Sequence, residues 1–372
     1  MTNSPPLILD TTLRDGEQTP GVVFSLNDKL TLAALLDKAG IQEVEIGSPA
    51  MGNTEIADMC EITGRGFGFK TLSWCRALKS DVDLAVKTGT DGIHISFPVS
   101  AIHLQSMGKS EKWVIRSLHE LIPYASEKFE YVTAGMQDAS RTDLRFLKEC
   151  IHALLKYRVK RVRIADTVGI LNPFSTFDMI NNLHHDFSAT ALEFHGHNDL
   201  GMATANSLAA YKGGAVCINT TVNGLGERAG NTAMDEFVMA MHHSFGVRLP
   251  IRTELFNELA SLAANASGIP VPVNKPVTGP GVFYHETGIH TNLLLKNRET
   301  YQIIPAASIG RKEDEFVFGK HSGVHAFRAL LEKHNLYLSD DRCKELLNLI
   351  KIEAVRLKRS LTGRELLAMV ER

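Results

Sequence analysis

Short apolar runs alternate with longer amphipathic stretches from the start of the chain to about residue 246. The short runs are rich in β-branched residues, which predicts strands, and the stretches between them have helical periodicity. The predicted strands are Leu7–Asp10, Val44–Gly47, Lys70–Cys75, Gly92–Pro98, Tyr131–Gly135, Arg161–Asp166, Ala191–His197 and Cys217–Asn223.

The clearest predicted helix is Leu26–Ala39. Ser25 and Asp28 form a capping-box-like start, and Gly40 provides a stop. Further helices are expected over Met202–Tyr211, from near Thr232, and over Glu254–Asn265, Gly323–His334 and Asp341–Lys358.

Strand and helix units repeat about eight times in roughly 245 residues, which predicts an α/β fold, a closed (β/α)8 TIM barrel. An open doubly wound sheet is the alternative, but it calls for an early dinucleotide-binding fingerprint that this sequence lacks. After Phe245 the alternation stops, and Gly268–Pro276 is rich in the prolines and glycines of a boundary. We therefore expect a catalytic barrel at 1–265, a linker and small subdomain at 266–322, and a helical subdomain at 323–372.

The composition is that of an ordinary globular protein. The 372 residues are 44% hydrophobic and 22% charged, with a formal net charge of −2. Basic residues are dispersed, and the densest cluster, Arg356–Arg359, is interpreted as a solvated helix face, so no nucleic-acid partner is expected. No run approaches the roughly 18 apolar residues of a membrane span, and Met1–Pro6 lacks the features of a secretory leader. A cytoplasmic location without a membrane partner is the expectation.

The cysteines are scattered and include no C-x-x-C pair, so reduced core thiols are expected rather than disulfides or a zinc cage. They are Cys60, Cys75, Cys150, Cys217 and Cys343.

The candidate chemistry begins with His195 and His197. Residues i and i+2 of a strand point to the same side, so both imidazoles would project together at the end of the seventh strand. A surface pair or a hydrogen-bonded core pair is the alternative to metal ligation. Glu193 shares this face and could orient a ligating ring, while Asn198 and Asp199 are competing candidate ligands.

The first strand leads into Arg14 and Asp15. With the two histidines, Asp15 would complete a site of one carboxylate and two imidazoles with open positions for substrate oxygens. Arg14 could polarise a ketone oxygen, or it could form a structural salt bridge to Asp15 or Glu45.

The last strand leads into a glycine-rich loop that ends at Asn231. The loop is a weak phosphate motif, and a tight turn that closes the barrel is the alternative. Asn231 is a candidate metal ligand or partner of a ligand.

These residues lie in motifs that resemble the α-isopropylmalate and homocitrate synthases. The likeness covers nearly the whole chain. It is carried by Leu13–Gln18 followed after ten residues by Lys29, by Leu192–Ala205, by Ala165–Gly169, by the Gly226–Asn231 loop, and by Gly319–Gly323.

The resemblance implies a metal-dependent Claisen condensation, in which acetyl-CoA is deprotonated at its methyl, adds to an α-keto acid and is hydrolysed. Asp15, His195 and His197 match the metal ligands, with Asn231 near the metal. Arg14 matches the residue that holds the keto oxygen. Gln18, Thr167 and Glu193 match residues that line the keto-acid pocket. The donor set suits Mg²⁺, Mn²⁺, Co²⁺ or Zn²⁺.

Beyond the barrel, His290 matches the family histidine proposed to act in methyl deprotonation, and Tyr301 matches its tyrosine partner. His285 belongs to the same cluster, and a loop histidine at a domain contact is the alternative reading of His290. Gln137 departs from the family, which usually has a glutamate there. A neutral amide stabilises an imidazolium less well, so a slower enzyme or a less essential position is expected.

Several motifs resemble most closely the homocitrate synthases of the nitrogen-fixation type. They include Trp74–Arg76, Phe97–Ser100 and Asp138–Arg141. The expected substrate is then 2-oxoglutarate, with Arg76 and His94 as candidates to bind its distal carboxylate. 2-Oxoisovalerate and pyruvate are the alternatives, and no leucine-regulated domain is expected. An acyl-CoA lyase of the same superfamily and a non-catalytic metal- and keto-acid-binding relative also stay open. The family further implies a homodimer.

Overall fold

Two compact units, residues 1–270 and 271–372, make up the computed structural model of the chain. It describes residues 4–312 and 315–370. Met1–Asn3, part of the segment in which no secretory leader is expected, lie outside the described residues. Among the described helices, none is both long and apolar enough to cross a membrane.

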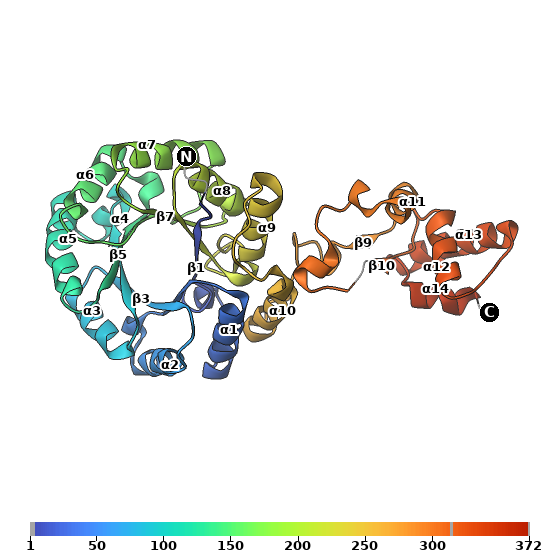
Figure 1. Ribbon diagram of the computed structural model, residues 1–372, viewed down its shortest axis with the longest axis horizontal. Coiled ribbons are helices and arrows are strands. Elements are labelled where there is room, and N and C mark those ends of the chain that lie inside the picture. The colour runs from blue at the N-terminus through green and yellow to red at the C-terminus, as the bar shows by residue number, and fades with distance from the viewer. Residues whose placement is uncertain (1–3, 313–314, 371–372) are drawn as a thin grey trace. The chain divides into compact units, whose positions relative to one another are not determined.

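The first unit is a closed barrel of eight parallel strands in sequence order, which confirms the predicted (β/α)8 fold. Figure 1 shows the strands at the centre with the helices around them. The strands are β1 (Leu7–Asp10), β2 (Glu43–Gly47), β3 (Lys70–Arg76), β4 (Gly92–Pro98), β5 (Tyr131–Gln137), β6 (Val162–Asp166), β7 (Leu192–Gly196) and β8 (Cys217–Thr220).

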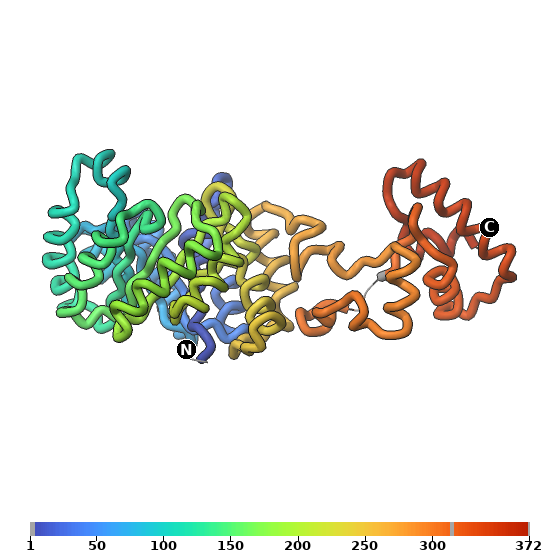
Figure 2. Tube along the Cα trace, turned by 90° about the horizontal axis from the view of Figure 1, so that it is seen from above, coloured from blue at the N-terminus to red at the C-terminus, as the bar shows by residue number. Residues whose placement is uncertain are grey.

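The helices of the first unit cover the outside of the barrel. They are α1 (Leu26–Ala39), α2 (Asn53–Gly64), α3 (Lys79–Ala85), α4 (Ala101–Ser106), α5 (Glu111–Ser126), α6 (Leu144–Leu154), α7 (Pro173–Asp186), α8 (Ala203–Gly213), α9 (Met234–Phe245) and α10 (Phe256–Ser267). The capping box predicted at Ser25 and Asp28 is present, and Gly40 ends α1 in the left-handed conformation. Figure 2, seen from above, shows the segment that leads into β1 at the lower end of the barrel.

Strand β8 corrects one prediction. It ends at Thr220 rather than Asn223, because Val222–Gly224 forms a 3₁₀ turn in which Asn223 has a φ of 58°. The following helix begins at Met234, close to the predicted start near Thr232. The strand therefore ends, and the turn begins, earlier than the β-branched composition of this segment suggests.

The barrel interior is polar at many positions, while the outward-facing strand residues are apolar. In β4, Ile93, Ile95 and Phe97 are fully buried, and the intervening His94 bonds Thr133 on β5 through its Nδ1 at 2.8 Å. Strand alternation thus separates an apolar layer against the helices from a polar layer inside.

The second unit has its own core. It contains a two-stranded parallel sheet, β9 (Tyr284–His285) with β10 (Glu315–Phe316), and the helices α11 (Gly288–Lys296), α12 (Val324–Lys333), α13 (Asp340–Leu357) and α14 (Gly363–Val370). Phe318 packs with apolar side chains of α12, α13 and α14. A separate boundary at 322/323 stays a prediction.

The cysteines are free, as predicted, and four of them are buried. Cys60 is exposed, so the expectation of a core thiol is wrong at that position.

Candidate metal centre and active site

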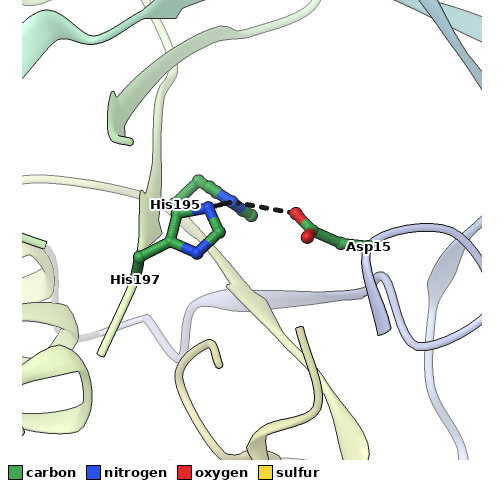
Figure 3. Close-up of side chains that lie close together, drawn as sticks. All are labelled: Asp15, His195 and His197. Carbon is green, nitrogen blue, oxygen red and sulfur yellow. Dashed lines mark hydrogen bonds and ion pairs between the residues drawn. The ribbon is translucent and has the colours of Figure 1, made fainter. Parts of the chain in front are cut away.

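Asp15, His195 and His197 converge at the carboxyl ends of β1 and β7. His195 Nε2 lies 3.2 Å from Asp15 Oδ2 and 3.2 Å from His197 Nε2. One ligand atom from each of the three buried residues lies within 4.8 Å of the others, and Figure 3 shows the side chains pointing toward one another. The spacing suits a single metal ion bound by two imidazoles and a carboxylate.

The protonation states of this group favour metal binding. Burial would raise the pKa of Asp15, but the charge of Arg14 and the hydrogen bond to His195 hold it well below its usual value. Burial, helped by the neighbouring His195, lowers the pKa of His197 to about 4. At neutral pH the site therefore offers an ionised carboxylate and a neutral His197 ring.

Asn231 lies against the same group. It forms an isolated β-bridge with His197, and its Nδ2 donates to the Leu225 carbonyl at 2.9 Å. Its buried Oδ1 has no hydrogen-bond partner among the described residues. A Cβ on Gly226 would lie only 2.2 Å from Asn231 Nδ2, so glycine is needed for this approach. A buried amide oxygen without a partner, on a residue that pairs with His197, fits a place for a divalent ion.

Arg14 forms the predicted salt bridges, and its role at a ketone oxygen stays a prediction. Its guanidinium pairs with Asp15 at 3.0 Å and with Glu45 at 2.6 Å, and it stacks over the Trp74 ring. These contacts fix the arginine beside the candidate ligands. Its Nη1 also lies 3.5 Å from Gln18 Oε1, at the limit of hydrogen bonding.

A buried ion-pair network inside the barrel contacts the candidate site through Glu45. Arg163 pairs with Glu45 at 2.6 Å and with Glu193 at 2.5 Å, while Arg161 pairs with Glu193 at 2.8 Å and with Glu43 at 2.5 Å. Burial would raise the pKa of both central carboxyls, but the arginines lower that of Glu45 to about 2 and also lower that of Glu193. All of these charges are thus compensated inside the barrel.

Glu193 has no exposed surface, and it is connected to the candidate metal ligand His195 through Asn219. Its Oε1 accepts from Asn219 Nδ2 at 2.8 Å, and Asn219 Oδ1 lies 3.0 Å from His195 Nδ1. Asn219, rather than Glu193, therefore orients the His195 ring. Direct contact of Glu193 with substrate stays a prediction.

The remaining predicted barrel residues have different surroundings. Thr167 Oγ1 accepts from the Asp138 backbone at 2.8 Å, whereas Arg76 is half exposed and forms a double hydrogen bond with Asp81. His94 Nε2 is buried without a partner among the described residues, and burial lowers the pKa of this ring to about 3. Gln137 is the last residue of β5.

The second unit brings His290 and Tyr301 together. Their rings stack with centroids 3.9 Å apart and an interplanar angle of 30°. Tyr301 is 45% exposed. In the same unit, burial together with the charge of His290 lowers the pKa of His285. The predicted pairing of His290 with Tyr301 is therefore present in this unit.

Asn219, Glu43, Arg161 and Arg163 were missed from the sequence. A signal existed, since charged residues recur at alternate positions of otherwise apolar strands, as in Glu43–Glu45 and Arg161–Arg163. Nothing in the sequence shows which strand supplies the partner.

In TIM-barrel enzymes the active site lies at the carboxyl ends of the strands. The carboxylate and imidazoles lie at that face here, so the fold and the site together indicate an enzyme of the TIM-barrel class. The HMGL-like family matches residues 6–263, and the family described as homocitrate synthase post-HMGL domain-like matches residues 277–358. The chain belongs to the α-isopropylmalate/homocitrate synthase family of acyl-CoA-condensing enzymes.

Individual relatives match over nearly their whole length. The chain is 40% identical to 2-isopropylmalate synthase 2 of Caldanaerobacter subterraneus over 99% of its own residues and 96% of that protein. It is 41% identical to homocitrate synthase 1 of Nostoc sp. over 98% and 97%, respectively. Hydroxymethylglutaryl-CoA lyase from Pseudomonas aeruginosa has the same barrel fold, with a TM-score of 0.62 and 19% identity over 79% of this chain and 100% of the lyase.

Proposed function

We propose that the protein is a homocitrate synthase, which condenses acetyl-CoA with 2-oxoglutarate and water to give homocitrate and CoA. The observation that carries the proposal is the grouping of Asp15, His195 and His197 beside Arg14 at the barrel's carboxyl face. The motifs resembling nitrogen-fixation homocitrate synthases support the choice of substrate. Supply of homocitrate for nitrogenase cofactor synthesis is the corresponding role.

Asp15, His195, His197 and Asn231 would hold the divalent metal. A bound metal of this kind supplies Lewis-acid polarisation of the keto acid. Arg14, fixed by Asp15 and Glu45, presents positive charge where the keto oxygen becomes an alkoxide. Gln18 and Thr167 would orient the keto acid, and Arg76 and His94 stay proposed contacts for its distal carboxylate.

His290, stacked on Tyr301, would take the proton from the acetyl methyl group. The resulting carbanion forms a carbon–carbon bond with the keto carbon, and the keto oxygen takes up a proton. Water then cleaves the thioester, which releases CoA as the free thiol.

The alternative synthases differ only in the keto acid. The chain is also 36% identical to (R)-citramalate synthase of Methanocaldococcus jannaschii, covering 98% of this chain and 74% of that protein. The test is CoA release from acetyl-CoA with 2-oxoglutarate, 2-oxoisovalerate or pyruvate, with and without added divalent metal. Metal-dependent release with 2-oxoglutarate as the preferred acid is expected. Preference for another keto acid would refute the homocitrate assignment, and no release with any of them would refute synthase activity.

We also propose that the enzyme works as a homodimer in the cytoplasm, with His290 acting on the partner's barrel. Mixed His290→Ala and Asp15→Ala proteins should then regain activity, because one of the hybrid sites retains both residues. Heterodimers that form but stay inactive would contradict this arrangement.

A further inference from the structure

An ion pair at the carboxyl face of the barrel joins the loops after β7 and β8. Arg228 donates to both carboxylate oxygens of Asp199, from Nε at 2.7 Å and from Nη2 at 3.1 Å. The sequence makes Asp199 a candidate metal ligand, but both of its oxygens bind this guanidinium, and the converging group of candidate ligands is formed by other residues. The proposed function therefore leaves the pair without a role.

The same guanidinium also binds a third loop. Arg228 Nη2 donates to the backbone carbonyl of Thr167, in the loop after β6, at 2.6 Å. One side chain thus connects the loops that follow three successive strands of the barrel. Three of the motifs that carry the family resemblance meet at this arginine, namely Ala165–Gly169, Leu192–Ala205 and Gly226–Asn231.

The backbone of Arg228 has a conformation that is unfavourable for arginine. Its φ is 56°, in the left-handed region that residues with a side chain rarely adopt. Glycine would adopt this conformation without strain, and the same loop has glycines at positions 226 and 230. A strained arginine in such a loop indicates that its side chain has a function.

The three loops approach one another closely around the pair. Gly169 has a φ of 60°, and a Cβ there would lie 2.8 Å from Asp199 Oδ2 and 2.9 Å from the His197 carbonyl oxygen. Only a glycine allows this approach of the loop after β6. In addition, the Asn198 N–H donates to the Gly230 carbonyl at 2.9 Å, which joins the loops after β7 and β8 through their backbones.

Two residues of the candidate metal centre lie on the loops that this pair connects. His197 precedes Asp199 by two residues, and Asn231 follows Arg228 by three. His197 and Asn231 form an isolated antiparallel bridge with each other. A displacement of either loop would therefore move one candidate ligand relative to the other.

The exposure of the pair argues against a role in stability alone. The side chain of Arg228 is 39% exposed and that of Asp199 is 23% exposed. Ion pairs that are open to solvent contribute little to the free energy of unfolding. A contact through two parallel hydrogen bonds does, however, fix the orientation of the two groups, which a single ammonium contact does not. The geometry suits positioning better than stabilisation.

We propose that the Asp199–Arg228 ion pair positions His197 and Asn231 for metal binding by holding the loops after β6, β7 and β8 in place. Asp199 and Arg228 are positioning residues in this arrangement, and neither contacts the metal. The inference rests on the proposed function, which places the metal at these residues.

The test is calorimetric titration of metal-free Arg228→Gly, Asp199→Asn and the double variant with Zn²⁺ and Mn²⁺. Arg228→Gly removes the pair and also relieves the backbone strain, so its denaturation midpoint should stay at or above that of wild type. We expect each single variant to weaken metal binding about tenfold, the lower end of the usual effect of residues behind the ligands. The double variant should lose no more affinity than either single variant, because the two residues act as one unit.

Two controls separate positioning from backbone strain and from surface charge. Lys358→Gly relieves a φ of 53° just after α13, and Arg145→Ala removes a double hydrogen bond to Asp143. Both should bind metal within about twofold of wild type. A roughly hundredfold loss in Asp199→Asn with none in Arg228→Gly would make Asp199 a metal ligand and overturn the proposal. Additive losses in the double variant, or an unchanged Kd in both single variants, would also overturn it.

Hydrogen exchange of the metal-free protein measures the positioning without any metal. The N–H groups of Asn198 and Asn231 donate to the carbonyls of Gly230 and Gly224, both at 2.9 Å. In Arg228→Gly these two amides should exchange about tenfold faster than in wild type, while the amides of α1 keep their rates. Unchanged exchange of both would refute the positioning, whereas a wild-type protein that binds no metal would refute the proposed function instead.

Discussion

Asn219 is predicted to control metal affinity without contacting the metal. Its Oδ1 is placed to accept a hydrogen bond from His195 Nδ1 at 3.0 Å, which leaves the Nε2 lone pair of that ring free for a metal. Its Nδ2 donates to the buried Glu193 carboxylate at 2.8 Å. Asn219→Ala removes both hydrogen bonds and frees the ring to rotate.

The expected loss of metal affinity is about 10- to 100-fold, the usual effect of removing the group that orients a ligating histidine. This corresponds to about 1.4 to 2.7 kcal/mol. The fold should lose roughly 2 to 4 kcal/mol as well, since one lost hydrogen bond is neutral and the other is to a charged group.

The assay is calorimetric titration of the metal-free full-length protein with Zn²⁺, Co²⁺ and Mn²⁺, with chemical denaturation measured in parallel. Asn206→Ala is the matched control, because Asn206 is a buried amide on α8 that donates to the Leu171 carbonyl at 2.8 Å. It should lose stability and keep its metal affinity. A folded Asn219→Ala protein whose metal Kd lies within about twofold of wild type would refute the reasoning.

Three further predictions concern residues whose charge, or lack of it, affects stability or catalysis. Lys29→Met leaves three carboxylates without their shared cation, so unfolding experiments at pH 7 should show a loss of about 3 kcal/mol that Lys29→Arg largely avoids. Burial lowers the pKa of His94 to about 3, below its ordinary value of 6.5, so its contribution to stability is complete above pH 6.5 and is lost as the pH falls toward 3. His94→Gln should therefore lose less stability than wild type over that range in parallel denaturation curves, and equal slopes would contradict the assignment. Gln137→Glu should raise kcat about tenfold or more with little change in either KM, because a carboxylate stabilises a protonated base, and a lower kcat in steady-state assays would count against that role.

The barrel was predictable because its signals are local. Each strand has its own apolar run, and α1 has a complete capping box with a glycine stop. Where the local signal misled, a turn was responsible: Val222 and Asn223 look like strand residues but belong to a 3₁₀ turn. β-branched composition does not reveal such a change of direction.

The three candidate metal ligands, Asp15, His195 and His197, were predictable for a similar reason. His195 and His197 are two residues apart on one strand, and Asp15 follows the strand that must lie at the same face of a parallel barrel. The partners of these residues were not predictable. Asn219 contacts His195 because β7 and β8 are neighbours in a particular register, and sequence spacing does not encode register.

Arg76 is a candidate whose pairing partner was not predicted from the sequence. A cation at the end of β3 is a reasonable candidate for a distal carboxylate, but Asp81 in the following helix α3 pairs with it. The side chain is 55% exposed, so this pair is only weakly held and a substrate carboxylate could compete for the arginine. Sequence alone could not distinguish a free cation from a paired one.

The ion-pair network inside the barrel connects Arg14 with the candidate metal ligand His195. Arg14 contacts Glu45, Glu45 contacts Arg163, and Arg163 contacts Glu193, which holds Asn219 against His195. The arginine expected at the keto oxygen and a histidine expected at the metal are therefore positioned by one continuous chain of buried contacts. Buried charges of this kind add little net stability, because desolvation offsets their attraction. Their value here is geometric: groups proposed to act on the same carbonyl are fixed relative to each other before substrate arrives.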